Sequence, residues 1–260
     1  MAEIADQEKK KPNKLEHECF PQPTDTSTSV WRYIDIAKLI SMLEVDALYL
    51  TRLNLFDDPY EGSLTHISAQ ARDEFFIREL GDTPQNRRMI SQMAAHSKEM
   101  LKGFYVNCWN LGNHESEAMW KLYCGTSTGV AIRTSYSRLV AALDNDPNLY
   151  VGKVTYLDYE KQWFPPGNIY YPVMHKRVSF EHEREVRLVK TLSEYMMQGS
   201  PEGPPGISVP FHFADAIEAI YVNPYAPEYY FQAVRSVVRR MAPEFETKLV
   251  WSGLRRTPSY

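Results

Sequence analysis

Residues 106–134 constrain the fold more than any other part of this 260-residue chain. Their sequence, VNCWNLGNHESEAMWKLYCGTSTGVAIRT, predicts a strand, a polar turn, a short amphipathic helix, a glycine-rich hinge and a second strand. Acidic and hydroxyl side chains at residues 115–117 suit the exposed N–H groups of a helix N-terminus, and Gly125 and Gly129 frame the helix exit. A polar, aromatic-rich turn between two apolar strands is a favourable place for a ligand pocket.

The rest of the chain predicts one α+β domain with a mixed, mostly antiparallel sheet, a helical insertion and flanking helices. Asp35 is suited to cap a helix whose apolar residues recur at helical spacing, and Thr83 and Pro84 are suited to begin another. We expect strands at residues 30–33, 47–51, 150–156, 207–213, 216–222 and 248–251, and helices at 64–80, 84–104, 137–143 and 228–241. The helices at 64–80 and 84–104 are expected to form an insertion that covers the sheet.

The two ends of the chain are predicted to lie outside this domain. Residues 1–29 carry a run of lysines, several prolines and a Thr/Ser-rich end, a composition that buries little apolar surface and is typical of a disordered tail. The domain is therefore expected to span residues 30–252, followed by a short tail at 253–260.

Composition and charge narrow the class of protein. A formal net charge of -4 argues against a general surface for nucleic acid or anionic membrane, and no apolar run approaches the length of a membrane-spanning helix. Three cysteines without a CxxC pair or metal-like spacing make a disulfide framework and a zinc site unexpected. The sequence thus predicts a soluble, cytoplasmic protein with no metal cofactor.

Two polar segments are candidates for a site. The loop at residues 54–63 presents Asp57, Asp58 and Glu61 around a proline and a glycine, which suits either a rigid acidic turn or a ligand contact.

The second segment, residues 174–189, is the most highly charged part of the chain. If it is a strand from residue 183 onwards, Glu183, Glu185 and Arg187 share one face. Carboxylates two residues apart repel unless a cation lies between them, and Lys176, Arg177 or Arg187 would supply it. Either an edge strand with surface ion pairs or a site for a cationic or hydroxyl-rich ligand fits this pattern.

Several familiar signatures do not occur in the sequence. It contains no GxxxxGK[ST] phosphate loop, GxGxxG fingerprint, HExxH zinc helix or GxSxG elbow. Cys108 and Cys124 are more typical of buried thiols than of nucleophiles, because no partner histidine is indicated for either.

With these residues in view, the chain resembles the domain of unknown function 2971 family. Four blocks carry the resemblance: WRY at residues 31–33, FDDPYE at 56–61, SEAMWKLY at 116–123 leading to GVAI at 129–132, and EREVR at 183–187. The family often has asparagine where this chain has Asp57, so a ligand contact at that position does not transfer directly. The resemblance implies a fold rather than an activity.

A looser likeness is to the ADP-ribosyltransferases, which hold NAD in a cleft between small sheets. Their plan of a basic residue, a hydroxyl or aromatic residue and a late glutamate is similar to the order Arg32, Tyr49 or Thr51, and Glu183 or Glu185 here. The likeness implies that the arginine binds the pyrophosphate or a ribose and that a glutamate stabilises a cationic, sugar-like transition state.

The likeness also implies that aromatic side chains in the 116–123 block stack on nicotinamide. The predicted site then has Glu183 and Glu185 as catalytic residues and, as substrate-binding residues, Arg32, Tyr49, Thr51, Asp57, Ser116, Trp120, Tyr123, Lys176 and Arg187.

Three functions stay open at this point. The first is an NAD-using transferase or glycohydrolase with NAD as co-substrate, and it requires Arg32 and the late glutamates to meet in one cleft. The second is a non-enzymatic regulatory module whose aromatic cleft around Trp120 binds a nucleotide, peptide or partner. The third is a phosphate-processing enzyme with a metal among Asp57, Asp58, Glu183 and Glu185. A small-molecule nucleotide is the expected partner, and whether a protein or a nucleic acid serves as acceptor is open.

Overall fold

The computed structural model describes residues 17–125, 127–143, 146–197 and 199–259. Its strands are β1 (Ser29–Ile34), β2 (Ala47–Arg52), β3 (Phe104–Leu111), β4 (Val130–Ser135), β5 (Leu149–Lys153), β6 (Thr155–Leu157), β7 (His175–Arg177), β8 (Glu185–Thr191), β9 (Gly206–Pro210), β10 (Ala219–Val222) and β11 (Leu249–Trp251). Its helices are α1 (Ile36–Val45), α2 (His66–Leu80), α3 (Pro84–Met100), α4 (Glu117–Cys124), α5 (Tyr136–Ala141), α6 (Tyr171–Met174), α7 (Phe213–Ala216) and α8 (Glu228–Met241), with short 3-10 turns between them.

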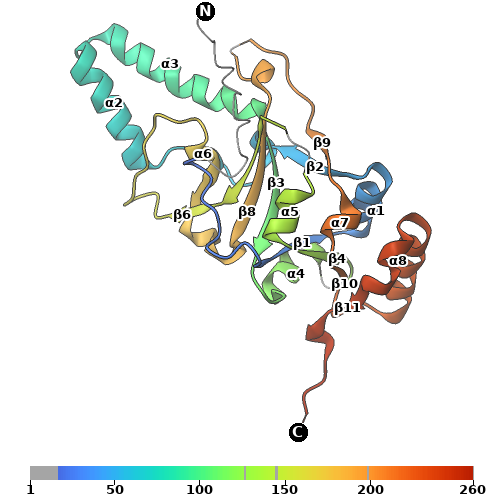
Figure 1. The fold of residues 1–260 in the computed structure, drawn as a ribbon. Coiled ribbons are helices and arrows are strands. Elements are labelled where there is room, and N and C mark those ends of the chain that lie inside the picture. The colour runs from blue at the N-terminus through green and yellow to red at the C-terminus, as the bar shows by residue number, and fades with distance from the viewer. Residues whose placement is uncertain (1–16, 126, 144–145, 198, 260) are drawn as a thin grey trace, which may run out of the picture.

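One nine-stranded sheet organises the molecule (Figure 1). Its main path runs β11-β10-β4-β1-β3-β2-β9, and β8 adds to β3 and carries β5 on its far side. Among the described strands of this sheet, only β10 and β11 pair in parallel, and the small two-stranded sheet of β6 and β7 is parallel as well. The prediction of an α+β domain with a mixed, mostly antiparallel sheet is confirmed.

Strand β3 is the centre of this sheet because three strands depend on it. Its sequence FYVNCWNL is almost entirely buried, and β8 pairs with it along the full length, from Phe104 opposite Thr191 to Asn110 opposite Glu185. Its other edge takes two strands in turn. Strand β2 pairs as far as Val106, and β1 pairs only from Asn110 onwards. The sheet therefore splits between β1 and β2 at residues 107–109.

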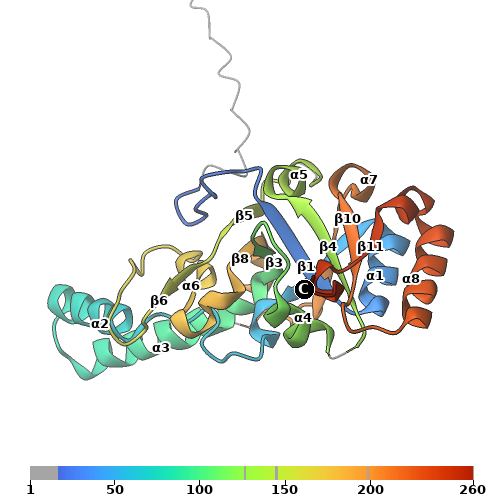
Figure 2. The same ribbon diagram turned by 90° about the horizontal axis from the view of Figure 1, so that it is seen from below.

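Helices α1 and α8 lie together at one end of the sheet, as both views show (Figures 1 and 2). Helix α1 begins where expected, since the Asp35 side chain accepts from the backbone N–H of Lys38. Helix α8 buries Val234 and Val238 in the main apolar core. The short helix α4 is capped by Ser116, whose hydroxyl accepts from the backbone N–H of Met119.

Helices α2 and α3 form an arm that projects from the body of the protein (Figures 1 and 2). Hydroxyl side chains cap both helices, Thr83 at the predicted start of α3 and Thr65 at the start of α2, for which no cap was predicted. Among the residues of these two helices, only Ser68 and Ile90 are buried. The prediction that the pair covers the sheet is therefore wrong, because the two helices extend away from the sheet and leave nearly all of their residues outside the buried core.

Two predicted strands are shorter than expected. The strand predicted at 207–213 ends at Pro210, and helix α7 takes the last residue of that predicted strand and the first residue of the strand predicted at 216–222. Phe211 still donates its backbone N–H to the carbonyl of Asp46 and bridges to Leu143, and the chain then leaves β2 for helix α7. Strand β10 then begins at Ala219.

The segment before β1 packs against the sheet over the part that is described. Residues 1–16 of the predicted disordered tail lie outside the described residues, whereas Cys19 and Phe20 are buried. The Phe20 ring stacks on Tyr150 at a centroid distance of 5.0 Å, and Gly152 lets the Phe20 backbone approach β5 closely. The aromatic Phe20 supplies the apolar surface that anchors residues 17–28.

At the other end, residues 253–255 form a 3-10 turn that is also tied to the domain. The Arg255 guanidinium lies 3.9 Å from the centre of the Trp251 ring and donates to the carbonyl of Ala226. Residue 260 lies outside the described residues. Within the described part of the chain, no helix has the length and apolar character needed to cross a membrane.

Gly129 should be the least replaceable glycine of the α4–β4 connection. It has a φ of +100°, and an added Cβ would lie 2.5 Å from the Cβ of Cys124 and 3.0 Å from the carbonyl of Ile34. We expect Gly129→Ala to lower the free energy of unfolding by about 3 kcal/mol through overpacking and backbone strain. Urea denaturation followed by circular dichroism measures the change.

Gly125 provides the matched control. Its φ is also positive, at +62°, but an added Cβ would meet nothing within 4 Å. Gly125→Ala should therefore cost only the backbone strain, about 1 kcal/mol. Equal losses in the two variants would contradict the packing argument for Gly129.

Candidate functional site

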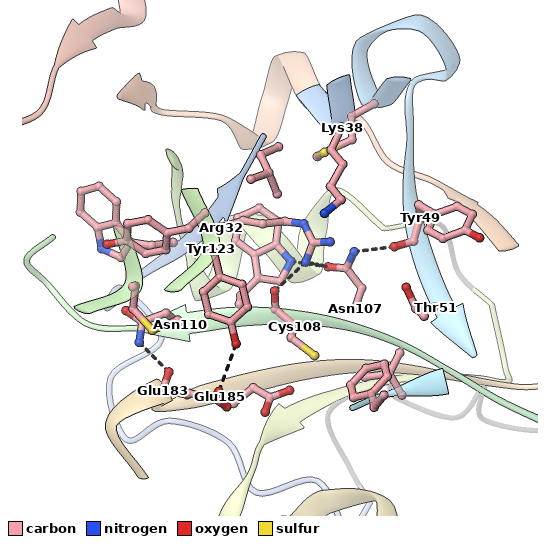
Figure 3. Close-up of a pocket in the computed structure, with 18 of the residues that line it drawn as sticks. Arg32, Lys38, Tyr49, Thr51, Asn107, Cys108, Asn110, Tyr123, Glu183 and Glu185 are labelled. Atoms are coloured by element: carbon pink, nitrogen blue, oxygen red, sulfur yellow. Dashed lines mark hydrogen bonds between the residues drawn. The ribbon is translucent and has the colours of Figure 1, made fainter. Parts of the chain in front are cut away.

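The split in the sheet opens a gap that side chains bridge (Figure 3). Arg32 of β1 reaches across it, donating from Nη1 to the backbone carbonyl of Cys108 (2.6 Å) and to Oδ1 of Asn107 (3.0 Å). Asn107 in turn donates from Nδ2 to the carbonyl of Tyr49 on β2 (2.8 Å), and its Oδ1 also accepts from the indole of Trp109 (2.8 Å). These bonds take the place of the missing rungs between β3 and its two neighbours.

A cleft of about 730 Å3 lies over this gap. Strands β1, β2 and β3 form its floor, and helix α4, residues 55–61 and the 3-10 turn Val178–Glu183 form its sides. Helix α1 and strands β7 and β8 contribute lining residues as well, and the lining polar groups include Arg32, Lys38, Tyr49, Thr51, Asp57, Asp58, Glu61, Asn107, Asn110, Tyr123, Lys176, Glu183 and Glu185.

Arg32 is an uncompensated cation at one end of the cleft. Among the described residues, no carboxylate forms an ion pair with it, and its Nε is buried without a hydrogen-bond partner. Burial lowers the pKa of the Arg32 guanidinium, because a charge without a counter-ion is poorly solvated there. Nearby Lys38 also lines this end, but it pairs with Asp35 on its own helix (3.2 Å).

The other end of the cleft holds a cluster of three carboxylates around Lys176. Its ammonium lies 2.6 Å from Glu183 Oε2, 3.2 Å from Glu61 Oε1 and 3.4 Å from Glu185 Oε2. All four side chains are at most 9% exposed. Lys176 was predicted to bind substrate, and the geometry shows it holding the carboxylates together.

Arg187 completes this cluster on the side away from the cleft. Its side chain is fully buried and forms two bonds to Glu185, from Nε to Oε1 (2.7 Å) and from Nη2 to Oε2 (3.1 Å). Nη2 also donates to Glu61 Oε1 (2.8 Å), and Nη1 donates to the carbonyl of Val173. The paired, planar geometry is the one that suits a guanidinium to a carboxylate. We name Glu61, Lys176, Glu183, Glu185 and Arg187 the ionic cluster.

The two late glutamates stand on different elements. Glu183 ends the 3-10 turn Val178–Glu183, and Arg184 adopts a left-handed conformation with φ of 41° before β8 begins at Glu185. The predicted common strand face for Glu183, Glu185 and Arg187 is therefore wrong for Glu183. The turn still brings Glu183 back beside Glu185, since both touch the same Lys176 ammonium.

The contacts of Glu183 differ from those of Glu185. The Tyr123 hydroxyl donates to Glu183 Oε1 (3.0 Å), and Asn110 Nδ2 donates to the backbone carbonyl of Glu183 (2.5 Å; Figure 3). Glu185 has cations on both carboxylate oxygens. Glu183 thus has one phenol and one lysine as side-chain partners. Glu185 is more deeply buried, and both Arg187 and Lys176 bind its carboxylate.

Burial and charge act in opposite directions on these groups. Burial raises the pKa of Glu185, but the charges of Arg187 and Lys176 outweigh it and lower that pKa to about 2. Burial raises the pKa of Tyr123, and the neighbouring Glu183 charge raises it further, so this phenol stays protonated and donates. The pKa of the Cys108 thiol is also raised by burial, so Cys108 is not an activated nucleophile.

Most of the predicted site residues meet in this cleft. Those that line it are Arg32, Tyr49, Thr51, Asp57, Tyr123, Lys176, Glu183 and Glu185. Three do not line it. Arg187 lies beneath the carboxylates, Ser116 caps helix α4, and Trp120 is fully buried with its indole donating to Glu115 (3.1 Å). The roles of Ser116 and Trp120 are therefore structural, and of the two aromatic residues predicted to stack only Tyr123 faces the cleft.

Sequence reasoning missed several groups that shape the cleft. Asn107 bridges the split strands, and no pattern in the sequence marks it. Glu61 joins the ionic cluster, whereas the sequence indicated for it a rigid acidic turn or a ligand contact and not the pairing with Lys176 and Arg187. Phe56 and Phe180 add aromatic faces to the same end of the cleft.

In the described part of the chain, no group of three or more His, Cys, Asp or Glu side chains has an arrangement that would hold a metal ion. The third function, which placed Asp57, Asp58, Glu183 and Glu185 around a metal, thus has no ligand set among the described residues. Glu183 and Glu185 direct their oxygens at Lys176 and Arg187 instead.

Comparison with known proteins gives a weak structural likeness and nothing closer. No family model and no curated protein matches the chain, so the resemblance to the domain of unknown function 2971 family is not confirmed. Two solved structures that match are DarT of Thermus sp. 2.9 in complex with carba-NAD+ (12% identity, TM-score 0.39, covering 88% of this chain and 96% of that one) and with ADP-ribosylated ssDNA (14%, 0.38, 89% and 96%). At these TM-scores the likeness decides no function.

Removing Arg187 should destabilise the protein severely, because it leaves Glu185 and Glu61 buried beside a single lysine. We expect Arg187→Met to lower the free energy of unfolding by about 3–5 kcal/mol. As a control, Arg235→Met removes an exposed cation that pairs with Glu246 on the surface and should cost less than about 1 kcal/mol. Urea denaturation of both variants measures the difference, and similar costs would show that the ionic cluster is not a structural centre.

The low pKa of Glu185 predicts an acid-sensitive fold. Because the pKa is lower in the folded protein than the ordinary value of 4.5, the contribution to stability is complete above about pH 4.5 and is lost as pH falls toward 2. Glu185→Gln should be less stable at pH 7 but should lose less stability between pH 5 and pH 3 than the natural protein. Unfolding free energies at both pH values test this, and parallel losses would argue against the assigned pKa.

Proposed function

We propose that the protein is an NAD-using enzyme of the ADP-ribosyltransferase or NAD glycohydrolase type. The observation that carries the proposal is the polarity of the cleft. An unpaired guanidinium stands at one end, ionised carboxylates stand at the other, and the aromatic side chains of Tyr49 and Tyr123 are partly exposed along it. A dinucleotide with a negative diphosphate and a positively charged nicotinamide ring has the complementary polarity.

Arg32 is the residue suited to the diphosphate. It is held by Asn107 and the Cys108 carbonyl, so its plane is fixed before a ligand arrives. Guanidinium groups match phosphate oxygens with parallel N–H bonds, and the unpartnered Nε of Arg32 is free to make such a bond. A phosphate would also supply the counter-charge that Arg32 lacks.

Glu183 is the residue suited to the reacting ribose. A carboxylate beside the ribose accepts a hydrogen bond from a ribose hydroxyl. It also stabilises the positive charge that develops on the sugar as nicotinamide leaves. Glu185 then acts as a positioning residue, because its two oxygens are occupied by Arg187 and Lys176. The structure-based proposal thus divides the two roles that the sequence assigned jointly to Glu183 and Glu185.

The reaction is a displacement at the anomeric carbon of the ribose. The bond from this carbon to the pyridinium nitrogen breaks, and the bonding pair stays with nicotinamide, which leaves neutral. Water or a nucleophile of an acceptor forms the new bond to the same carbon and releases its proton to the solvent or to Glu183. Hydrolysis yields ADP-ribose, and transfer yields an ADP-ribosylated acceptor. A cytoplasmic location remains a prediction from the sequence.

A second candidate is a binding module without turnover. The extensive ion pairing of the carboxylates favours it, since each glutamate in the cleft already has a cationic partner. Such a cleft would bind a nucleotide through Arg32 and the tyrosines while Glu183 serves only to keep the fold intact. Trp120, predicted as the centre of this binding surface, is buried and takes no part.

The deciding experiment is incubation of the purified protein with NAD, with and without cell lysate as a source of acceptor, while free nicotinamide is measured. The natural protein should release nicotinamide, and Glu183→Gln should reduce the rate by about a hundredfold or more, the usual loss for a missing transition-state contact. Glu244→Gln, the same change at an exposed position, should leave the rate unchanged.

Binding of NAD without release would favour the binding module. Thermal unfolding resolves this case, because any ligand that prefers the native state raises the unfolding temperature. The proposal of an NAD-using enzyme fails if NAD neither shifts the unfolding temperature nor releases nicotinamide under any of these conditions.

A further inference from the structure

Two carboxylates of the loop at residues 54–63 each have one oxygen without a partner. Asp58 accepts from Arg177 Nη2 at Oδ1 (2.7 Å), whereas its Oδ2 is buried and unpartnered. Glu61 accepts from Lys176 and Arg187 at Oε1, whereas its Oε2 is likewise buried and unpartnered. The two side chains are 8% and 3% exposed, and both line the cleft. Leaving buried acceptors without donors is costly, so a ligand that donates here removes that cost.

The same end of the cleft carries an excess of negative charge. Its carboxylates are Asp57, Asp58, Glu61, Glu183 and Glu185, and its cations are Lys176, Arg177 and Arg187. Five negative charges against three positive charges leave a net charge of -2 at this end. We name these eight residues the acidic wall. It repels an anionic ligand group and attracts a cationic one.

Aromatic faces stand beside the unpartnered oxygens. Phe180 lies under the Lys176 ammonium at 4.7 Å, Phe56 lies 5.9 Å from the Arg187 guanidinium, and both rings line the cleft. Phe180 and Phe56 already make cation–π contacts with protein side chains. Such rings can also stack on a flat, positively charged ring of a ligand. The acidic wall therefore suits a planar cation with hydrogen-bond donors.

The position of Arg32 fixes the direction in which a dinucleotide lies. Arg32 has an unpartnered donor and belongs to the opposite end of the cleft, on β1. With the diphosphate at Arg32, the pyridine base is the part of the ligand that reaches the acidic wall. The chemistry of the substituent on that ring then decides the fit, because an amide donates two N–H bonds and a carboxylate donates none.

We propose that the acidic wall selects dinucleotides with an amidated, positively charged pyridine ring and rejects the acid analogue, with Asp58 and Glu61 as the specificity-determining residues. This inference rests on the proposed use of NAD, and it adds that the cleft recognises the carboxamide of the pyridine ring. The unpartnered oxygens accept from the carboxamide, whereas the carboxylate of nicotinic acid adenine dinucleotide meets two unpaired acceptors and a net negative wall.

The test compares the affinities of NAD, nicotinic acid adenine dinucleotide and ADP-ribose. Stopped-flow tryptophan fluorescence is suited to it, because Trp31 and Trp109 line the cleft and the signal is recorded before turnover. The natural protein should bind NAD at least about tenfold more tightly than the acid analogue. This is the effect expected when one added negative charge on the ligand contacts carboxylates whose charges are partly screened by solvent. ADP-ribose, which has no pyridine ring, reports on the Arg32 end alone.

Asp58→Asn is the informative variant. Its amide oxygen can still accept from Arg177, while an N–H donor replaces the unpartnered acceptor Oδ2. The preference for NAD over the acid analogue should fall several-fold, with the affinity for ADP-ribose unchanged. Glu61→Gln should act in the same direction, and thermal unfolding of each variant confirms that it is folded. Asp82→Asn, on the projecting arm, is the matched control and should keep the full preference.

The outcomes separate this inference from the proposed function. Equal affinities for NAD and the acid analogue in the natural protein overturn the selectivity and leave the use of NAD intact. A preference that persists undiminished in both folded variants overturns the assignment to Asp58 and Glu61. Absence of binding by both NAD and ADP-ribose overturns the proposed function, and the selectivity with it.

Discussion

The contact of Lys176 with three glutamates, supported by Arg187 below, is the interaction on which the cleft depends. It joins the consecutive elements β7, the 3-10 turn Val178–Glu183 and β8 to the loop that carries Glu61, more than a hundred residues earlier in the sequence. Burying these charges is unfavourable unless each is paired, so no member can move without exposing another to an apolar surrounding. The cluster thereby fixes the position of Glu183 more firmly than the backbone of a short turn would.

The second constraint is the split of the sheet along β3. A strand edge that is left open inside a protein must satisfy its backbone groups in another way. Arg32 and Asn107 do so, and the same bonds orient the Arg32 guanidinium into the cleft. The group that seals the gap between β1 and β2 is therefore also a lining residue of the cleft whose Nε is buried without a hydrogen-bond partner.

Sequence patterns predicted the α+β class, the central strand–helix–strand segment, the helix caps at Asp35 and Thr83, and eight of the residues that line the cleft. These features depend on local chemistry, which the sequence shows directly.

The patterns failed where tertiary contacts determine the position of a side chain. Alternation of charged residues placed Glu183 on a strand, whereas the left-handed Arg184 separates it from β8. Trp120 was expected in the cleft because it is aromatic, but it is fully buried, with its indole donating to Glu115. Nothing in the sequence shows that Asn107 stands at a gap in the sheet.

The projecting arm of α2 and α3 starts and ends at one place on the body. Gly62, just before the arm, lies so close to Leu101, just after it, that an added Cβ would come within 2.5 Å of the leucine side chain. The two ends of the arm are therefore held together by residues that lie outside helices α2 and α3. Because the entropy of closing a loop changes only slowly with the number of residues inside it, the arm can lengthen, shorten or diverge among relatives at little thermodynamic cost. In evolutionary terms it is the part of this molecule that is free to change while the cleft stays as it is.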